Sequence, residues 1–392
     1  MSGAAPQAMI HWIEDGEPRS ARWRSESGLP APKKVVIADD RTNADVAYRL
    51  ACEGSAMLWR GDFQTARQLL QALARRADHK HDKSGKRAKA AKEARAAKPP
   101  ASPTEAFHLH RQAQSQRART LAMLLLPFDA DYTIPLRRAP DVKLACNEAY
   151  GRGDEPFVAT LRELLGLIGA HEWRRSGVEL AALGQRIHPH YGVFAPIRSE
   201  YVGLVAQAPL PPRADLAFDI GTGTGVLAAV LAQRGVARIV ATDMDPRALS
   251  CARENLQRLG LAGQVDVVQA DLFPPGRAAL VVCNPPWLPA RPSSPIEFAV
   301  YDPDSRMLRG FLDGLAAHLE PGGEGWLILS DLAEHLGLRP RAELDAWIAA
   351  AGLRVLGRID VKPTHPRAAD AADPLHSARA AEVTSLWRLG AA

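Results

Sequence analysis

The stretch Asp219-Ile220-Gly221-Thr222-Gly223-Thr224-Gly225 stands in the second half of this 392-residue sequence. It follows the short apolar run 216–218 and precedes residues 226–233, which are rich in alanine, leucine and valine, so it marks a turn from a strand into a helix. Glycines at such a turn leave the backbone amides of the helix N-terminus accessible to a ligand. The turn alone does not distinguish nucleotide enzymes, flavoproteins and plain tight turns.

Predicted strands and helices alternate from Leu216 onward. One helix has Asp245 as its N-cap, Pro246 at its first position and Gly260 just past its end. Seven strands are expected, at residues 217–220, 238–242, 265–270, 280–283, 326–329, 353–359 and 382–389. This alternation predicts an α/β protein with a Rossmann-like, doubly wound seven-stranded sheet.

Two carboxylates follow the second and third strands. Asp243 lies twenty positions after Gly223, where a carboxylate can accept hydrogen bonds from both hydroxyls of a ribose. Its alternative role is a helix cap, which Asp245 already supplies. Asp271 precedes Leu272, so the carboxylate can accept from an adenine amino group while the leucine covers the ring. The alternative for Asp271 is a turn residue at a strand end.

The fourth strand ends in the sequence Asn284-Pro285-Pro286-Trp287. Two prolines remove two backbone donors and fix the chain, so the carbonyls after Asn284 are expected to point outward as acceptors. The Asn284 side chain adds another acceptor, and Trp287 adds a flat face for a planar amide or base. Together these groups can hold a planar NH2 group by its hydrogens and orient its nitrogen for transfer. The alternative is a mere turn.

With these motifs in place, residues 216–329 resemble a class I S-adenosylmethionine-dependent methyltransferase of the "small domain" N-methyltransferase type. The variants in question are the release-factor glutamine methyltransferases of the HemK type and the ribosomal-RNA guanine N2-methyltransferases. The resemblance implies S-adenosylmethionine as cofactor. It implies cofactor contacts at Asp219, Gly221, Gly223, Gly225, Asp243 and Asp271, and catalytic roles for Asn284, Pro285 and Trp287. Thr222 within the turn and Leu272 beside Asp271 are expected to contact the cofactor as well.

The methyl acceptor stays open at this point, because the glutamine enzymes usually carry Tyr at Trp287 and the RNA enzymes Phe followed by His. Leu288-Pro289 favours transfer to a planar amide, a glutamine side chain of a translation-related protein. The alternative is an amino group of a base in ribosomal RNA or another nucleic acid, favoured by the basic run 75–98 and by Arg111, Arg117, Arg119, Arg137 and Arg138. The same basic residues would equally suit binding to a ribosome, so charge does not separate the two acceptors. An inactive binding module and a dinucleotide oxidoreductase are disfavoured, the second because the glycine pattern is Gly-x-Gly-x-Gly.

Composition divides the chain into four expected parts. Residues 1–74 predict a small α/β unit of unknown role, residues 75–104 a basic flexible linker, residues 105–190 a helical subdomain, and residues 191–392 the methyltransferase domain. Helices are expected at 108–126 and 157–168 in the α-rich first half. The linker composition cannot bury enough apolar surface to offset chain entropy.

Bulk properties narrow the environment and the partners. Four scattered cysteines predict neither disulfides nor a zinc site, so no metal is expected. No export signal or membrane span is expected, which favours the cytoplasm. The net charge of +5 fits a macromolecular acceptor such as a translation protein, the ribosome or RNA. The sequence leaves the oligomeric state open.

Several residues near these motifs have two interpretations. The segment 191–201, with Phe194, Pro196 and Arg198, either covers the cofactor or packs on the sheet. His188 and His190 have no partner at metal-ligand spacing and receive no role. His365 and Arg367 belong either to a solvated loop or to the acceptor side.

Overall fold

The structure is a computed structural model that describes residues 8–79, 100–292, 295–364 and 370–392. The chain divides into two compact units. The first consists of Met1–Ala101 and His108–His171, and the second of Ser102–Phe107 and Glu172–Ala392. The first contains a six-stranded sheet, and the second contains a seven-stranded sheet and the two-stranded sheet of β7 (Val178–Leu180) and β8 (Gln185–Ile187).

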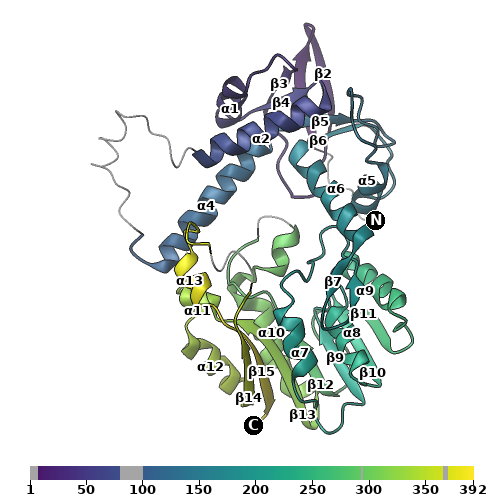
Figure 1. Cartoon of the computed structure of the whole chain (residues 1–392), viewed down its shortest axis with the longest axis vertical. Helices are drawn as coiled ribbons and strands as arrows, with labels where there is room; N and C mark the ends of the chain where they lie inside the picture. Colours follow the sequence, from purple (N-terminus) through teal and green to yellow (C-terminus); the bar gives the residue numbers. More distant parts are fainter. Residues whose placement is uncertain (1–7, 80–99, 293–294, 365–369) are drawn as a thin grey trace. The chain divides into compact units, whose positions relative to one another are not determined.

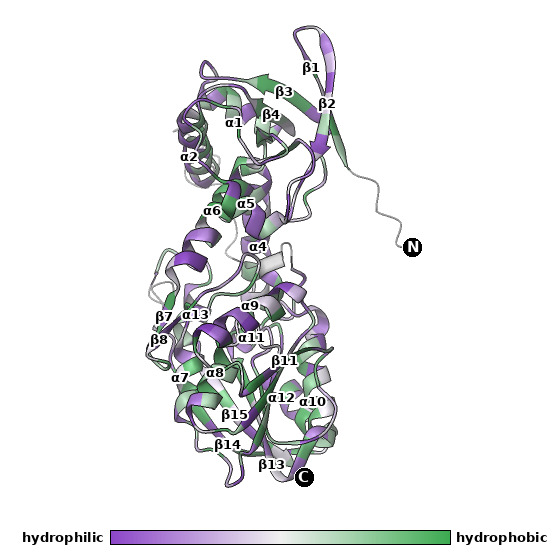
Figure 2. Ribbon diagram, turned by 90° about the vertical axis from the view of Figure 1, so that its right-hand side faces the viewer, coloured by the Kyte–Doolittle hydropathy of each residue, from purple (hydrophilic) through white to green (hydrophobic). Residues whose placement is uncertain are grey.

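The sheet of the first unit has the strand order β1-β2-β6-β5-β4-β3. β3, β4 and β5 are parallel, whereas β6 runs antiparallel to β5 and the hairpin of β1 and β2 joins beside β6. The hairpin is mostly hydrophilic and β3 is hydrophobic (Figure 2). The strands are β1 (Met9–Glu14), β2 (Glu17–Trp23), β3 (Lys34–Ala38), β4 (Ser55–Trp59), β5 (Leu124–Phe128) and β6 (Phe157–Thr160), and the helices are α1 (Ala44–Cys52), α2 (Phe63–His79), α5 (Lys143–Tyr150) and most of α4 (Pro103–Leu121) and α6 (Leu161–Ser176).

Two helices expected in the first half have other bounds. α4 ends at Leu121 and the apolar residues that follow form β5, so the expected helix at 108–126 is too long. The expected helix at 157–168 begins too early, because β6 occupies its first residues. All four residues of β6 are buried. A strand buried on both faces is a continuous apolar run, which periodicity does not separate from a buried helix.

The first unit also groups its residues differently from the expected parts. β5 and β6 come from the expected helical subdomain, 105–190, yet they complete the sheet of the strands within 1–74. Of the expected linker, 75–104, the structure places the first residues in α2 and the last in α4, and residues 80–99 lie outside the described residues. The expected domain 191–392 lies within the second unit.

The large sheet of the second unit has the order β11-β10-β9-β12-β13-β15-β14. Neighbouring strands are parallel except for β15, which runs antiparallel to both β13 and β14 (Figure 1). The strand order reverses beside β9, so this is a doubly wound sheet as predicted. The strands are β9 (Leu216–Ile220), β10 (Arg238–Asp243), β11 (Val265–Gln269), β12 (Ala278–Cys283), β13 (Leu319–Ser330), β14 (Leu353–Val361) and β15 (Thr384–Ala391).

Helices cover both faces of this sheet. Alternate strand residues such as Ala217 and Val282 pack with α7, α8 and α9, whereas Phe218 and Val281 pack with α10 and α12. Seven of the eight residues of α8 are buried, which explains its nearly all-apolar sequence. The helices are α7 (Glu200–Gln207), α8 (Val226–Gln233), α9 (Pro246–Arg258), α10 (Arg306–His318), α11 (Leu332–His335), α12 (Arg341–Ala350) and α13 (His376–Ala381). In the described part of the chain, no helix is long and apolar enough to cross a membrane.

Candidate active site

The predicted site residues lie at the ends of four neighbouring parallel strands, β11, β10, β9 and β12, at the same edge of the sheet. In the register of these strands, Asp219 of β9 lies between Ala241 of β10 and Val282 of β12. The glycine turn, Asp243 and Asn284 therefore come together where these strands end, beside the reversal of strand order. The sheet thus brings to one edge residues as far apart in the sequence as Asp219 and Asn284, which are separated by 65 positions.

Asp219, at the end of β9, stabilises the glycine turn through hydrogen bonds. The Thr222 hydroxyl donates to Asp219 Oδ2 at 2.6 Å, and the Ala228 amide donates to the same oxygen at 3.1 Å. The Thr222 amide donates to the carbonyl of Thr242, which joins the turn to β10. Gly225 is the N-cap of α8 and has a φ of 81°. These bonds fix the turn so that its outer side stays available to a ligand.

Asp219 is a buried carboxylate with one oxygen left over. Its side chain is completely buried, and its Oδ1 has no hydrogen-bond partner among the described residues. Burial raises the pKa of Asp219 to about 6, against the hydrogen bonds from Thr222 and Ala228. A cationic group next to this oxygen would be stabilised, so the residue fits a ligand that brings positive charge.

Asp243 joins the glycine turn to the next helix. Its Oδ2 accepts from the Gly223 amide at 3.0 Å, and its Oδ1 accepts from the Asp245 amide at 3.0 Å. Asp245 caps α9 as predicted, through a bond from the Arg247 amide. Burial raises the pKa of Asp243, which remains partly accessible at the strand end. A Cβ added at Gly223 would meet nothing within 4 Å, so there is room for a ligand beside this carboxylate.

Asp271 and Leu272 lie at the next strand end, on an exposed edge. The Thr242 hydroxyl donates to the Leu272 carbonyl at 2.6 Å, which ties this turn to β10, and Leu272 has a φ of 71°. Asp271 forms an ion pair with Arg306 at 3.0 Å, and its side chain is 55% exposed. Sequence reasoning missed Arg306, which lies 35 positions away at the start of α10 and carried no motif.

Asn284 and Trp287 contact each other. The Trp287 indole donates to Asn284 Oδ1 at 3.0 Å. Pro285, which follows Asn284 in the sequence, is buried. The asparagine oxygen has two lone pairs, so one remains for a hydrogen of an incoming NH2 group. The bond fixes the orientation of the Asn284 amide. A Phe ring has no hydrogen-bond donor, and a Tyr ring carries its hydroxyl at a different position, so this hydrogen bond depends on the indole of Trp287.

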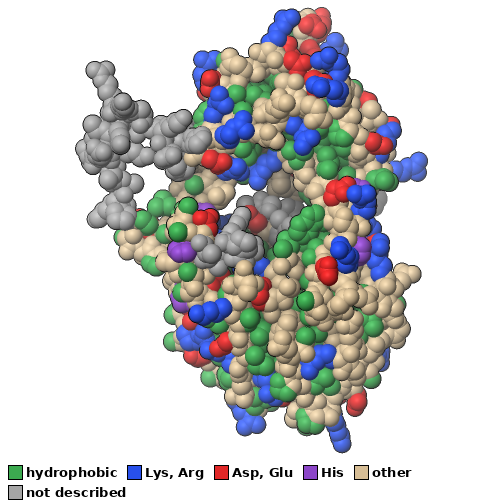
Figure 3. Space-filling view, in the orientation of Figure 1, with side chains coloured by type: hydrophobic (Ala, Val, Ile, Leu, Met, Phe, Trp, Pro, Cys, Tyr) green, Lys and Arg blue, Asp and Glu red, His purple; other side chains and the backbone are tan. Residues whose placement is uncertain are grey.

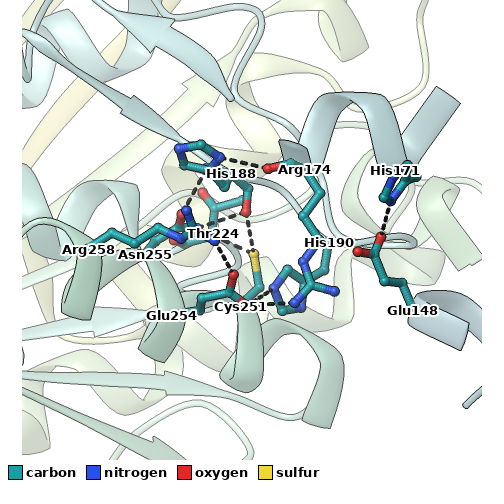
Figure 4. A network of polar contacts seen from close by, with 10 residues as sticks. All are labelled: Glu148, His171, Arg174, His188, His190, Thr224, Cys251, Glu254, Asn255 and Arg258. Carbon is teal, nitrogen blue, oxygen red and sulfur yellow. Dashed lines mark hydrogen bonds and ion pairs between the residues drawn. The ribbon is translucent and has the colours of Figure 1, made fainter. Parts of the chain in front are cut away.

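The segment before β9 is fastened to α9 by a polar network (Figure 4). Asn255 accepts from the His188 amide at 2.8 Å and donates to the carbonyl of Thr224 in the glycine turn at 3.1 Å. Glu254 accepts from Arg174, Arg258 and the ring of His190 at 2.7–2.8 Å. Both histidines therefore have structural contacts. In the sequence, Asn255 stands at helical spacing after Ala248, Cys251 and Ala252, and a polar residue in this apolar row was the signal that could have located it.

Burial alone would raise the pKa of Glu254, but hydrogen bonds from Arg258, Arg174 and His190 outweigh burial and lower the pKa to about 2. The carboxylate is therefore charged over the whole physiological range and holds the network together. Within the described ranges, no group of three or more His, Cys, Asp or Glu side chains could hold a metal ion. His365 and Arg367 lie outside the described residues.

Comparison with known protein families identifies the centre of the second unit. Residues 185–335, which contain the glycine turn, both carboxylates and Asn284, match the family model described as the methyltransferase small domain. This region of the second unit is therefore similar to the methyltransferase small domain, and the match covers less than half of the chain. The resemblance seen in residues 216–329 is thereby confirmed at the level of the family, and the roles of the individual residues stay predictions.

Relatives of known name match the same region. The chain is 33% identical over 196 residues to the release factor glutamine methyltransferase of Cereibacter sphaeroides, covering 46% of this chain and 65% of that protein. It is 39% identical over 115 residues to the enzyme of the same name from Moorella thermoacetica, covering 28% and 41%. It is 51% identical over 69 residues to the ribosomal protein L11 methyltransferase of Pelotomaculum thermopropionicum, covering 17% and 22%. The chain thus spans less than two thirds of the length of each of these relatives.

Among solved structures, the ribosomal protein L11 methylase of Lactobacillus delbrueckii subsp. bulgaricus is similar to this chain with a TM-score of 0.34 and 15% identity. The match covers 50% of this chain and 78% of that one. The order and directions of the strands in the seven-stranded sheet confirm the predicted fold class.

Proposed function

We propose that this chain is an S-adenosylmethionine-dependent N-methyltransferase whose acceptor is a glutamine side chain of a translation-related protein in the cytoplasm. The observation that carries the proposal is the meeting of the glycine turn, Asp243 and Asn284 at one sheet edge. The names of the relatives support the acceptor, because two of them are release factor glutamine methyltransferases. The methyltransferase small domain family supports the chemistry.

The residues present fit this cofactor. Asp243 would accept hydrogen bonds from the ribose hydroxyls, and the open space beside Gly223 would admit the cofactor. The unpartnered Oδ1 of Asp219 would face the positively charged methionine end, together with Gly221, Thr222 and Gly225. Asp271 and Leu272 would contact the adenine, which requires Arg306 to share or release the Asp271 carboxylate.

Catalysis would depend on positioning the acceptor nitrogen. S-adenosylmethionine would supply a methyl group on a sulfonium, so that the N–C bond would form as the S–C bond breaks and the electron pair would stay on sulfur. The free lone pair of Asn284 Oδ1 and the Pro285 carbonyl would each accept one hydrogen of the planar NH2 group. Trp287 would stack on that plane. These acceptors stabilise the positive charge that develops on nitrogen, which then loses one proton to water.

A second candidate acceptor is an exocyclic amino group of a nucleic-acid base. The observation in its favour is the run 75–98, where ten basic residues face three acidic ones in sequence. A planar base could stack on Trp287 as an amide does. The same run could equally hold the chain on a ribosome, where the glutamine acceptor would be found.

The experiment that tests the proposal is transfer of radiolabelled methyl groups to fractionated cell extract, with protease and nuclease applied separately afterwards. We expect the label to be lost only with protease, and peptide mass spectrometry to place it on a glutamine side-chain nitrogen. Release of the label only by nuclease would replace the amide by a base. The Asn284→Ala protein serves as the blank.

A further inference from the structure

Arg339 lies in the turn that precedes α12 and contacts the Asn284–Trp287 segment at the Trp287 carbonyl. Only 3% of its surface is exposed. Its guanidinium donates to the Trp287 carbonyl through Nη2 at 3.3 Å and to the Ser305 hydroxyl through Nη1 at 3.3 Å. The side-chain hydrogen bonds described for this cation therefore go to neutral oxygens. Burial lowers the pKa of Arg339, while the nearby carboxylates of Glu334, Glu343 and Asp302 favour its charged form, so these groups and the two hydrogen bonds hold the guanidinium in place.

The Ser305 end of this contact is a strained turn. Asp304 and Ser305 have positive φ values of 56° and 52°, which residues other than glycine rarely adopt. Asp302, which is 6% exposed, accepts from the amides of Met307 and Leu308 at 3.0–3.1 Å and so caps α10. The Asp302 amide in turn donates to the carbonyl of Leu288, just after Trp287. The turn therefore begins α10 at a fixed distance from the Asn284–Trp287 segment.

The first turn of α10 reaches the cofactor side of the sheet. A Cβ added at Gly221 would lie 2.5 Å from the Met307 methyl, so this methyl packs against the glycine turn. Arg306, the neighbouring residue, pairs with Asp271 at 3.0 Å. One short segment thus touches the predicted cofactor side through Arg306 and Met307 and holds Arg339 through Ser305.

The Trp287 end leads to the reacting amide. Arg339 holds the carbonyl of Trp287, and the indole of the same residue donates to Asn284 Oδ1 at 3.0 Å. Four residues thus form a continuous chain, Ser305–Arg339–Trp287–Asn284. Such a chain transmits position, because each member has its orientation set by the one before it.

We propose that Arg339 is a positioning residue that holds Trp287, and through its indole the Asn284 amide, in a fixed relation to the start of α10 and the glycine turn. The inference rests on the proposed function for its effect on rate, and on the structure alone for its effect on Trp287. It assigns this tryptophan a second task besides stacking on the acceptor, namely orienting Asn284. Arg339 touches neither acceptor nor cofactor in this role.

The first test observes Trp287 directly and needs no acceptor. The full chain is labelled with 15N-tryptophan, whose eight indole signals are resolved by NMR, and Trp287→Phe identifies the signal of this residue by its loss. We expect Arg339→Met to shift or broaden that one signal in a protein that still folds, and the melting temperature records the stability lost when the Trp287 carbonyl and the Ser305 hydroxyl lose their donor. Arg341→Met, two positions away, is the control and should leave the signal unchanged. An unchanged Trp287 signal in folded Arg339→Met overturns the inference.

The second test is kinetic. With the methyl acceptor, Arg339→Met should lower kcat about tenfold or more, while the cofactor Kd and the acceptor KM change less than about threefold. In the double variant with Trp287→Phe, the total loss should stay close to that of the larger single loss, because both changes act on the orientation of Asn284. Losses that multiply overturn the inference. If no acceptor is methylated at all, the proposed function fails and the NMR result still decides the inference.

Discussion

Asn284 has an amide oxygen that serves two partners at the sheet edge, the Trp287 indole and, in our proposal, the acceptor nitrogen. We expect Asn284→Ala to keep the fold and the cofactor affinity but to lower single-turnover methyl transfer on the order of a hundredfold or more, ~2.7 kcal/mol upward, because a positioned acceptor for developing charge is lost. Asn147→Ala, an exposed asparagine of the first unit, is the matched control. A variant that retains more than about a tenth of the wild-type rate would show that Asn284 does not orient the acceptor.

Asp219 predicts the pH dependence of cofactor binding. Burial raises its pKa to about 6 in the free protein, and a bound cation next to Oδ1 would lower it. The carboxylate is therefore favoured in the complex, so binding should release a proton around pH 6 and the affinity should fall as the pH drops below that value. Calorimetry in buffers of different ionisation enthalpy measures the released proton. Asp219→Asn should abolish the release, and its persistence in this variant would assign it to another group.

At the scale of elements, the turn from β9 to α8 separates two uses of glycine. Gly223 has a φ of 55° and open space beside it, whereas Gly225 has a φ of 81° and an added Cβ would lie 3.2 Å from the Ala252 Cα of α9. Both alanine variants incur the strain of a left-handed residue, about 1–2 kcal/mol. Gly225→Ala must in addition displace a helix backbone.

We therefore expect Gly225→Ala to lower the melting temperature more than Gly223→Ala does. Gly223→Ala should weaken cofactor binding more than Gly225→Ala does, because its new methyl group would enter the space that the cofactor requires. Thermal unfolding and calorimetric titration of the two variants, compared in parallel, measure these effects. Equal melting temperatures together with wild-type cofactor affinity in Gly223→Ala would contradict the assigned division of roles.

For the whole molecule, the distribution of charge matters more than the net value of +5. Residues 75–98 contain ten basic and three acidic side chains, so the rest of the chain is slightly acidic. On the face drawn in Figure 3, Lys and Arg side chains are interspersed with Asp and Glu. Positive charge is thus concentrated in one segment of the sequence, most of which lies outside the described residues.

This concentration leads to a prediction about partners. Neutralising Lys83, Lys86, Arg87, Lys89 and Lys92 should weaken binding to ribosomes or RNA and flatten its dependence on salt, because fewer counterions are released on binding. Cofactor affinity should not change. Co-sedimentation with ribosomes over a series of salt concentrations measures the slope. A slope equal to that of the unaltered chain would make these residues a solvated spacer.

What the sequence determined by itself is local. The glycine turn, the Asp245 cap and the alternation of strands and helices from Leu216 onward predicted the doubly wound sheet, because each depends on residues a few positions apart. The edge on which Asp243 and Asn284 meet followed from the sheet, since parallel strands end on the same side. The family model that matches residues 185–335 agrees with this part of the prediction.

Tertiary structure alone decided the contacts between distant segments. β5 and β6 were read as parts of helices, because a strand buried on both faces has no alternation, and only pairing with β4 and with each other identifies it. The links of Arg339 to Trp287 and of Arg306 to Asp271 span 52 and 35 positions. Single arginines carry no periodic signal, and their partners are set by how helices pack on the sheet rather than by the residues beside them.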